Sequence, residues 1–344
     1  MSTSTHQSTS GNRIGLGLLG APAVPEMVAL AQLAEGCEYE SVWVAETRIM
    51  RDAMVPCAAI ALGTSRLKVA TGIVNVYTRG AVLNAVSFVS LEEIAPGRII
   101  MGLGPGSPLV LEPQGYAFDK PVTRLRETID VIQRLHRGEQ VQFVGKAIEV
   151  HGAQLEATPP REHIPLYLGV TGPKALELAG EKANGVMLNA FLPASYVERA
   201  IERVAAGARR AGRSPSDVDI AGAVVVSVDE DAAAARDRAR PFIAMYLSLF
   251  PNLARETALA DALVERIRNT FREHGQDAAG ALVDDDVVDS LTVSGNVEDC
   301  RVRLGHYREA GLALPIVFAL EPNVEQAIRT LGARAAYHSS PAPM

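Results

Sequence analysis

The chain has 344 residues, 48% of them hydrophobic, which is enough to bury the core of two ordinary domains or of one large α/β barrel. Its 33 Lys and Arg against 40 Asp and Glu give a formal charge of -7, and the basic residues form no stripe, so nucleic acid is excluded as an expected partner. Cys37, Cys57 and Cys300 form no paired framework, and no apolar run approaches the ~20 residues of a membrane span. We therefore expect a cytoplasmic protein that binds no membrane.

Short apolar runs alternate with amphipathic stretches along the chain, as in βα units around a parallel sheet. The sequence predicts strands over 14–19, 41–46, 68–75, 98–104, 165–170, 185–189, 219–228 and 314–320. It predicts helices near 24–36, 51–63, 79–95, 121–137, 173–182, 194–212, 229–245 and 323–333. This strict alternation, with strands that are almost continuously apolar, favours a (β/α)8 TIM barrel over an open doubly wound sheet.

Two longer detours interrupt the alternation, after the fourth strand and after the seventh helix. The first should contain a small hairpin over 139–152, and the second should form extra helices. Neither has the Pro, Gly and Ser content of a linker between domains. We expect one barrel domain over 14–335 with insertions over 105–120, 138–164 and 246–293, a disordered tail over 1–13 and a second tail over 336–344.

The turns that follow the strands are the places to search, because the active site of such a barrel lies where strands end and helices begin. After the fifth predicted strand, "GVTGPK" (169–174) contains Gly169 and Gly172, which let the main chain approach a ligand closely. Pro173 suits a first helical position, the first-turn N–H groups and the helix dipole attract an anion, and Lys174 adds a positive charge. The alternative is a well-capped helix that binds nothing.

The turn after the third predicted strand is rich in polar side chains. Gly72, within a β-branched run, indicates a bulge or a close approach of backbones. Asn75, Tyr77, Thr78 and Arg79 then supply four hydrogen-bonding side chains within five positions, which is many for a simple connection. Alternatively, Arg79 pairs on the surface and Tyr77 packs on the following helix.

Two further turns carry candidate residues. "GLGPGSP" (102–108) does not meet the G-x-G-x-x-G spacing of a dinucleotide site, so we interpret it as a glycine-rich loop at the barrel mouth, where a flat ligand lies close to the backbone. Glu46, after the second strand, could accept a proton or hold a polar ring edge. Its alternative role is a salt bridge to Arg48 or Arg51.

Some kinds of chemistry lack candidate residues. No histidine ends a predicted strand, so a metal site of His and carboxylate type has no ligands, and we expect no metal. No G-x-S-x-G elbow is present and no cysteine lies at a strand end. Nucleophilic hydrolysis is therefore not expected.

Several stretches match a known family in order and spacing: "GVTGPKALELAGEKANGVMLN" (169–189), "GIVNVYTR" (72–79), "MGLGPG" (101–106) and the pair Arg51 and Asp52. On these residues the chain resembles the bacterial-luciferase-like flavin and deazaflavin oxidoreductases. Within that family it is most similar to the branch of methylene-tetrahydromethanopterin reductase, whose enzymes use the deazaflavin coenzyme F-420. The likeness covers roughly 14–335.

The resemblance implies a role for each turn. In this family the bulge carries a non-prolyl cis peptide against which the deazaflavin ring lies, here Gly72–Ile73. It also implies that Val74 and Asn75 line the ring and that Gly104 and Gly106 flank the cofactor. The segment Gly169, Val170, Thr171, Gly172, Pro173 and Lys174 is expected to bind the cofactor, with "VTGPK" taking its phosphate.

The resemblance also implies an activity: hydride transfer between coenzyme F-420 and a small organic substrate. An FMN-dependent monooxygenase that uses molecular oxygen is the first alternative, and a cofactor-binding barrel subunit without catalysis is the second. The family commonly has Asp-His after the second strand, whereas this chain has Glu46 and Thr47, so Glu46 is the candidate acid/base and Thr47 cannot replace the histidine. Family members usually pair, so we expect a homodimer or a higher homo-oligomer, with helices 24–36 and 51–63 as candidate contact surfaces.

Overall fold

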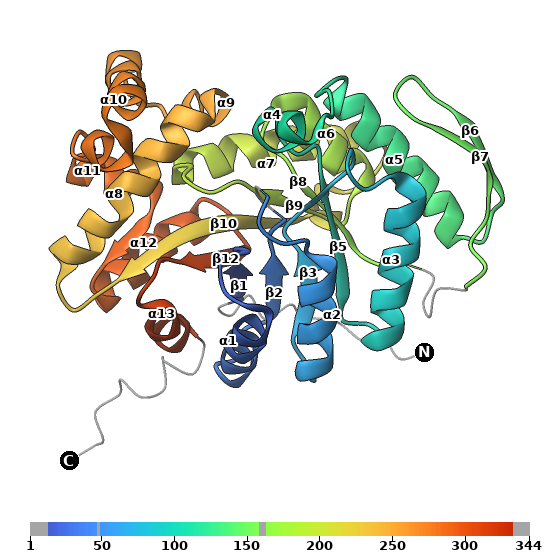
Figure 1. Cartoon of the computed structure of the whole chain (residues 1–344), viewed down its shortest axis with the longest axis horizontal. Helices are drawn as coiled ribbons and strands as arrows, with labels where there is room; N and C mark the ends of the chain where they lie inside the picture. The colour runs from blue at the N-terminus through green and yellow to red at the C-terminus, as the bar shows by residue number, and fades with distance from the viewer. Residues whose placement is uncertain (1–12, 47–48, 158–162, 333–344) are drawn as a thin grey trace.

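Parallel strands close into a barrel in the computed structural model, which describes residues 13–46, 49–157 and 163–332 (Figure 1). The barrel strands are β1 (Gly15–Leu18), β2 (Ser41–Val44), β3 (Lys68–Thr71), β5 (Ile99–Gly104), β8 (Leu166–Gly169), β9 (Gly185–Leu188), β10 (Asp219–Val228) and β12 (Leu314–Ala319). β12 pairs with both β1 and β10, and β10 pairs with β9, so these eight strands form a closed ring. The predicted (β/α)8 barrel is confirmed. The two tails expected at the chain ends lie outside the described residues, apart from Arg13.

Helices cover the outside of the barrel because its strands are apolar on both faces. They are α1 (Val24–Gly36), α2 (Met54–Gly63), α3 (Ala81–Ile94), α5 (Pro121–His136), α6 (Pro173–Lys182), α7 (Ala194–Arg210), α12 (Val297–Glu309) and α13 (Val324–Leu331). Figure 1 shows α1, α2 and α3 side by side along one flank. Pro121 and Pro173 begin α5 and α6, at a position where a missing N–H leaves no partner unsatisfied.

Additional elements extend the barrel at opposite ends of the molecule (Figure 1). Between β5 and β8 lie α4 (Pro108–Leu111), the 3-10 turn η1 (Glu112–Gln114) and a hairpin of β6 (Val141–Val144) and β7 (Glu149–Ala153). Beyond β10 lie α8 (Ala232–Leu249), α9 (Pro251–Ala254), α10 (Asp261–Gly280) and α11 (Asp285–Leu291). The hairpin expected over 139–152 is therefore present. A further 3-10 turn, η2 (Pro215–Asp217), precedes β10.

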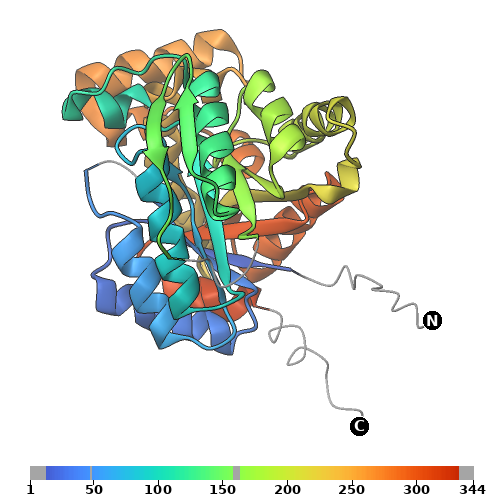
Figure 2. The same cartoon turned by 90° about the vertical axis from the view of Figure 1, so that its right-hand side faces the viewer.

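The helices beyond β10 have their own apolar core and border the barrel mouth. Ile243 and Leu247 of α8 pack with Ile267 of α10 in this second core. Phe191, in the loop after β9, stacks on Tyr246 of α8 with 4.3 Å between ring centroids. Figure 2, turned by 90°, shows these helices along the top of the molecule, beyond the ends of the strands. The insertion therefore forms part of the wall around the mouth.

Three features differ from the sequence prediction. The strand predicted over 68–75 is interrupted: β3 ends at Thr71, and the short β4 (Val74–Asn75) pairs with β5. The three-residue strand β11 (Val293–Gly295), which pairs with β10, and helix α12 were not predicted. α12 has mostly polar residues, and apolar periodicity is the main signal for a helix. Its capping box between Asn296 and Asp299 was the available sequence signal.

Side chains fill the inside of the barrel. Trp43, Ile100, Tyr167, Met187 and Phe318 all point inward and are at least nine-tenths buried. The Trp43 and Tyr167 rings make an edge contact at 5.3 Å between centroids. The interior is therefore a packed core, and a ligand can reach only the mouth at the carboxyl ends of the strands. Among the described residues, no helix combines the length and apolar character that crossing a membrane would need.

A charged network joins the opposite, amino-terminal ends of the strands. Arg13 Nε donates to Glu40 at 2.6 Å, and the Arg13 terminal nitrogens donate to Asp219 at 2.8 and 2.9 Å. Lys68 Nζ lies 2.9 Å from Glu40, and the Tyr167 hydroxyl donates to Asp219 at 2.8 Å. Burial alone would raise the pKa of Glu40, but the hydrogen bonds from Arg13 and Lys68 outweigh it and lower that pKa.

We expect Arg13→Ala to lower the free energy of unfolding by about 1–2 kcal/mol at pH 7, because two partly exposed carboxylates lose their shared partner. The pKa of Glu40 is lower in the folded than in the unfolded chain. Its contribution is therefore present above the ordinary pKa of 4.5 and is lost as the pH falls through the folded value. Urea unfolding at several pH values checks this: the gap between variant and wild type should shrink in acid, and a constant gap would contradict the assignment.

Candidate active site

The centre of the candidate site is the bulge between β3 and β4, where the Gly72–Ile73 peptide is cis. This bond is the one that the resemblance implied. The Ile73 side chain fills a space left by two glycines: an added Cβ would lie 2.7 Å from Ile73 Cδ1 at Gly104 and 2.6 Å from Ile73 Cγ2 at Gly169. Because Gly104 of β5 and Gly169 of β8 have no side chain, Ile73 can lie between these two strand ends at the mouth.

The next residues of the bulge are held by Asn75. Its Oδ1 accepts the backbone N–H of Tyr77 at 3.0 Å and that of Thr78 at 2.9 Å. Its own Cβ packs against the loop after β5, where a Cβ on Gly106 would lie 3.1 Å away. Gly106 has φ +67°, a left-handed conformation that glycine adopts without strain. Asn75 thus fixes two turns at once, and Val74 beside it is fully buried.

The predicted anion turn lies on the neighbouring strand. β8 ends at Gly169 beside Ile73, and α6 begins at Pro173 after the exposed N-cap residue Gly172. The space around Gly172 is open, since an added Cβ would meet nothing within 4 Å. Thr171 and Lys174 complete the turn, with Lys174 exposed. Val170, by contrast, is buried and serves packing.

A residue that sequence analysis missed holds this turn in place. The Tyr196 hydroxyl, on α7, donates to the Thr171 carbonyl oxygen at 2.6 Å. Burial raises the pKa of Tyr196, so the hydroxyl keeps its proton and remains a donor. No local sequence signal points to this contact, because the two residues lie 25 positions apart on different βα units.

Glu46 follows β2 at the mouth and is half-buried. Its Oε2 accepts the backbone N–H of Ala53 at 3.2 Å. Burial raises the pKa of Glu46, while the Ala53 N–H and the charge of Arg79 oppose the rise and the charge of Asp52 adds to it. A carboxyl group whose pKa is raised toward neutral pH is suited to proton transfer.

The alternative salt bridge between Glu46 and Arg51 is wrong, because Arg51 donates to the backbone carbonyl of Gly20. The alternative that Tyr77 packs on the following helix stays open. Tyr77 also has other contacts: its hydroxyl donates to the Asp119 carbonyl at 2.5 Å, and its ring lies under Arg124. Thr47 and Arg48 lie outside the described residues.

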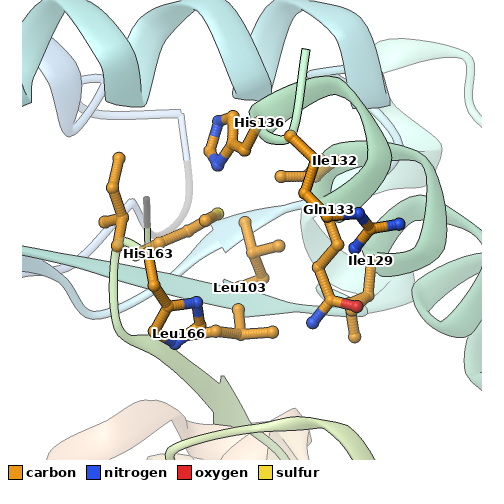
Figure 3. Close-up of a pocket in the computed structure, with 10 residues that line it drawn as sticks. Leu103, Ile129, Ile132, Gln133, His136, His163 and Leu166 are labelled. Carbon is orange, nitrogen blue, oxygen red and sulfur yellow. The ribbon is translucent and has the colours of Figure 1, made fainter. Parts of the chain in front are cut away.

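The cavity in Figure 3 lies away from the mouth. It encloses about 270 Å³ between α5 and the outer faces of β5 and β8, and its lining is Met101, Leu103, Ile129, Ile132, Gln133, His136, Arg137, His163, Ile164 and Leu166. Leu103 and Leu166 belong to the core between barrel and helices, whereas the candidate site lies at the strand ends. Within the described ranges, no three His, Cys, Asp or Glu side chains gather as a metal site would require.

The fold and the residues at its mouth define a class of protein. It is a closed parallel barrel that has a non-prolyl cis peptide in the bulge after β3, and beside this bulge a helix that begins after a glycine. The chain belongs to the family described as luciferase-like monooxygenase, whose model matches residues 1–314. It is 33% identical to a 5,10-methylenetetrahydromethanopterin reductase of Methanolobus tindarius over 92% of this chain and 98% of that protein.

Solved structures agree. The coenzyme F-420-dependent tetrahydromethanopterin reductase from Methanopyrus kandleri superposes with a TM-score of 0.86 at 27% identity, covering 95% of this chain and 99% of that one. An F-420-dependent secondary alcohol dehydrogenase, solved with an F-420-acetone adduct, gives a TM-score of 0.79 over 93% of this chain and 97% of that one. At 22% identity, the second likeness shows the fold alone.

Proposed function

We propose that the protein is an oxidoreductase that transfers a hydride between coenzyme F-420 and a small organic substrate. The observation that carries the proposal is the cis bulge at Gly72–Ile73, held between Gly104 and Gly169 at the barrel mouth. Family membership and the similarity to reductases named for methylenetetrahydromethanopterin support it.

The residues present fit a deazaflavin. Ile73 offers an apolar surface for a flat ring, and its side chain is held directly against the backbones of Gly104 and Gly169. When bound, the coenzyme supplies a hydride at a ring carbon. The chain's own residues position the substrate over that surface, exclude water from it and move a proton. Glu46 is the candidate for the last task, because it is half-buried and burial raises its pKa.

The turn from Thr171 to Lys174 is the proposed clamp for the cofactor phosphate. We expect Lys174→Met to weaken binding of F-420 by about three- to tenfold, the effect of one exposed charge near an anion. The same change should leave the affinity for the deazaflavin riboside, which lacks phosphate, unchanged. Titration of each ligand by its own fluorescence measures both. Equal loss for the two ligands would place the phosphate elsewhere.

The experiment that tests the function compares cofactors. Purified protein is titrated with F-420 and with FMN. Protein loaded with reduced F-420 is then assayed with 5,10-methylenetetrahydromethanopterin, the compound in the relatives' names, as hydride acceptor, and protein loaded with oxidised F-420 is assayed with simple secondary alcohols as hydride donors. We expect tight binding of F-420 and a substrate-dependent change in its absorbance. Binding of FMN without F-420 would favour the monooxygenase alternative instead.

Assembly into a homodimer is proposed from an exposed apolar face. Val55 and Leu62 on α2 are 61% and 75% exposed, and Leu83 and Val86 on the adjacent α3 are 52% and 45% exposed. α2 contains no charged residue. A surface of this kind on neighbouring helices is typical of a contact between subunits.

We expect the double variant Leu62→Glu with Val86→Glu to sediment as a monomer, because each subunit would bury two unpaired charges in the contact. Sedimentation velocity checks it. Val144→Glu is the matched control: Val144 is 69% exposed on the hairpin and should leave assembly unchanged. A wild-type protein that sediments as a monomer would contradict the proposal.

A further inference from the structure

The Arg79 backbone is held by hydrogen bonds, whereas its side chain makes no hydrogen bond to the residues that the structure describes. It directly precedes Gly80, the N-cap of α3. The Asn84 amide donates to the Arg79 carbonyl at 2.7 Å, and Asn75 closes the turn just before it. Yet Arg79 Nε is buried with no hydrogen-bond partner, and the structure records no ion pair of Arg79 with a described residue. Burying such a donor without a partner costs free energy.

Arg98 provides a contrast at the other end of the barrel. Its guanidinium donates to the Ala61 carbonyl at 2.6 Å, the Leu67 carbonyl at 3.0 Å and the Thr64 hydroxyl at 3.2 Å. The fold thus satisfies a structural arginine with acceptors that it supplies itself. Arg79, at the mouth, has donors left for a ligand.

Glu46 follows β2, and Arg79 closes the segment that begins at the bulge after β3 and continues through β4. β2 and β3 are adjacent and parallel, with Val44 opposite Thr71, so the two segments leave the barrel at the same part of the mouth. The Arg79 charge acts on Glu46, since it opposes the rise in the pKa of Glu46 that burial causes. No ion pair between the two side chains is recorded, and among the described residues Glu46 has one hydrogen-bond partner, the Ala53 N–H, at Oε2. One carboxylate oxygen and the guanidinium donors therefore remain for a third group.

The two charges together select the kind of group. A free carboxylate would be repelled by Glu46, and an ammonium by Arg79, so a neutral but dipolar edge suits the pair. We propose that Arg79 and Glu46 together bind the cyclic amide edge of a planar heterocycle, in which Arg79 donates to the ring carbonyl and Glu46 accepts from the adjacent ring N–H. This deepens the proposed function and rests on it. Such an edge occurs on the pyrimidinedione ring of the deazaflavin and on many heterocyclic substrates.

The test combines Arg79→Met with two probes. The first is F-420, whose dissociation constant is measured by its fluorescence. The second is lumazine, a small heterocycle with the amide edge, compared with 1,3-dimethyllumazine, in which both ring N–H groups are replaced. Both are titrated into F-420-loaded and unloaded protein. Arg209→Met, which removes an exposed arginine on α7, is the control, and thermal unfolding shows that each variant is folded.

If the edge belongs to the cofactor, Arg79→Met raises the Kd of F-420 by at least about tenfold, as expected for a lost charge-assisted hydrogen bond. If it belongs to the substrate, the Kd of F-420 stays within about twofold, while that of lumazine on loaded protein rises at least about tenfold. In that case wild type binds 1,3-dimethyllumazine as weakly as the variant binds lumazine. The proposal is overturned if F-420 affinity is unchanged and lumazine either fails to bind or is not distinguished from its dimethyl derivative. If wild type binds no F-420, the proposed function fails. The role of Arg79 is then tested separately, by comparing the lumazine affinity of unloaded wild type with that of unloaded Arg79→Met.

Discussion

Glu46→Gln should lower kcat with the F-420-dependent substrate by ~10²–10⁴-fold, the range for loss of a general acid or base, which is a much larger effect than that on the Kd of F-420. The amide has the shape of the carboxyl group and can still accept the Ala53 N–H, but it cannot exchange a proton. Stopped-flow or steady-state assays of deazaflavin absorbance measure the rate, and a fluorescence titration measures the affinity.

The same substitution should not destabilise the protein at neutral pH. Burial raises the pKa of Glu46 in the folded chain, so its contribution to stability is present below the ordinary pKa of 4.5 and is lost as pH rises through the folded value. Glu46→Gln should therefore be at least as stable as wild type at pH 7, with the advantage vanishing in acid. An unchanged kcat of Glu46→Gln would show that Glu46 transfers no proton in the reaction. A wild-type protein that is inactive with every substrate would support the alternative of a cofactor-binding subunit without catalysis.

Gly102→Ala should lower the free energy of unfolding by about 3 kcal/mol or more, at the upper end for an overpacked core. A Cβ at Gly102 would lie 1.8 Å from the Thr71 carbonyl oxygen, which is backbone and cannot rotate away. Thr71 also bridges the strands: its hydroxyl donates to the Gly102 carbonyl at 2.7 Å and accepts the Gly102 N–H at 3.0 Å. The variant must separate β3 from β5 immediately before the cis bulge.

The matched control for Gly102→Ala is Gly305→Ala. Gly305 lies within α12, and an added Cβ there would meet nothing within 4 Å. Alanine should stabilise that helix by about 0.5–1 kcal/mol. Urea unfolding gives both values. A Gly102→Ala protein as stable as wild type, with normal affinity for F-420, would show that the close approach of Thr71 and Gly102 does not support the site.

The barrel could be predicted because its signals are local. Apolar runs such as 185–189 and the helix start at Pro173 mark each βα unit without knowledge of the rest of the chain. The bulge at Gly72 was also visible, as a glycine in a β-branched run. Its cis peptide was implied only by the resemblance, because nothing in local propensity distinguishes a cis bond from an ordinary bulge.

The rest of the site depends on contacts between distant residues. In the sequence, Gly102 and Gly169 resemble turn glycines. In the structure, the absence of a Cβ lets the Thr71 carbonyl approach Gly102 and the Ile73 side chain approach Gly169. Tyr196 lies in the next βα unit and donates to the carbonyl of Thr171 in the anion turn. In the sequence it appears only as one residue on the apolar face of an amphipathic helix. The unpaired Nε of Arg79 could not be predicted either. The local sequence is the same whether an arginine forms a surface ion pair or keeps its donors for a ligand.

A crystal structure of the protein with oxidised F-420 tests the central claim most directly. We expect the deazaflavin ring to lie against Ile73 at the mouth, with the phosphate at the N–H groups of the turn from Thr171 to Lys174. A ring bound in the cavity beneath α5, or a phosphate remote from Gly172, would contradict the account.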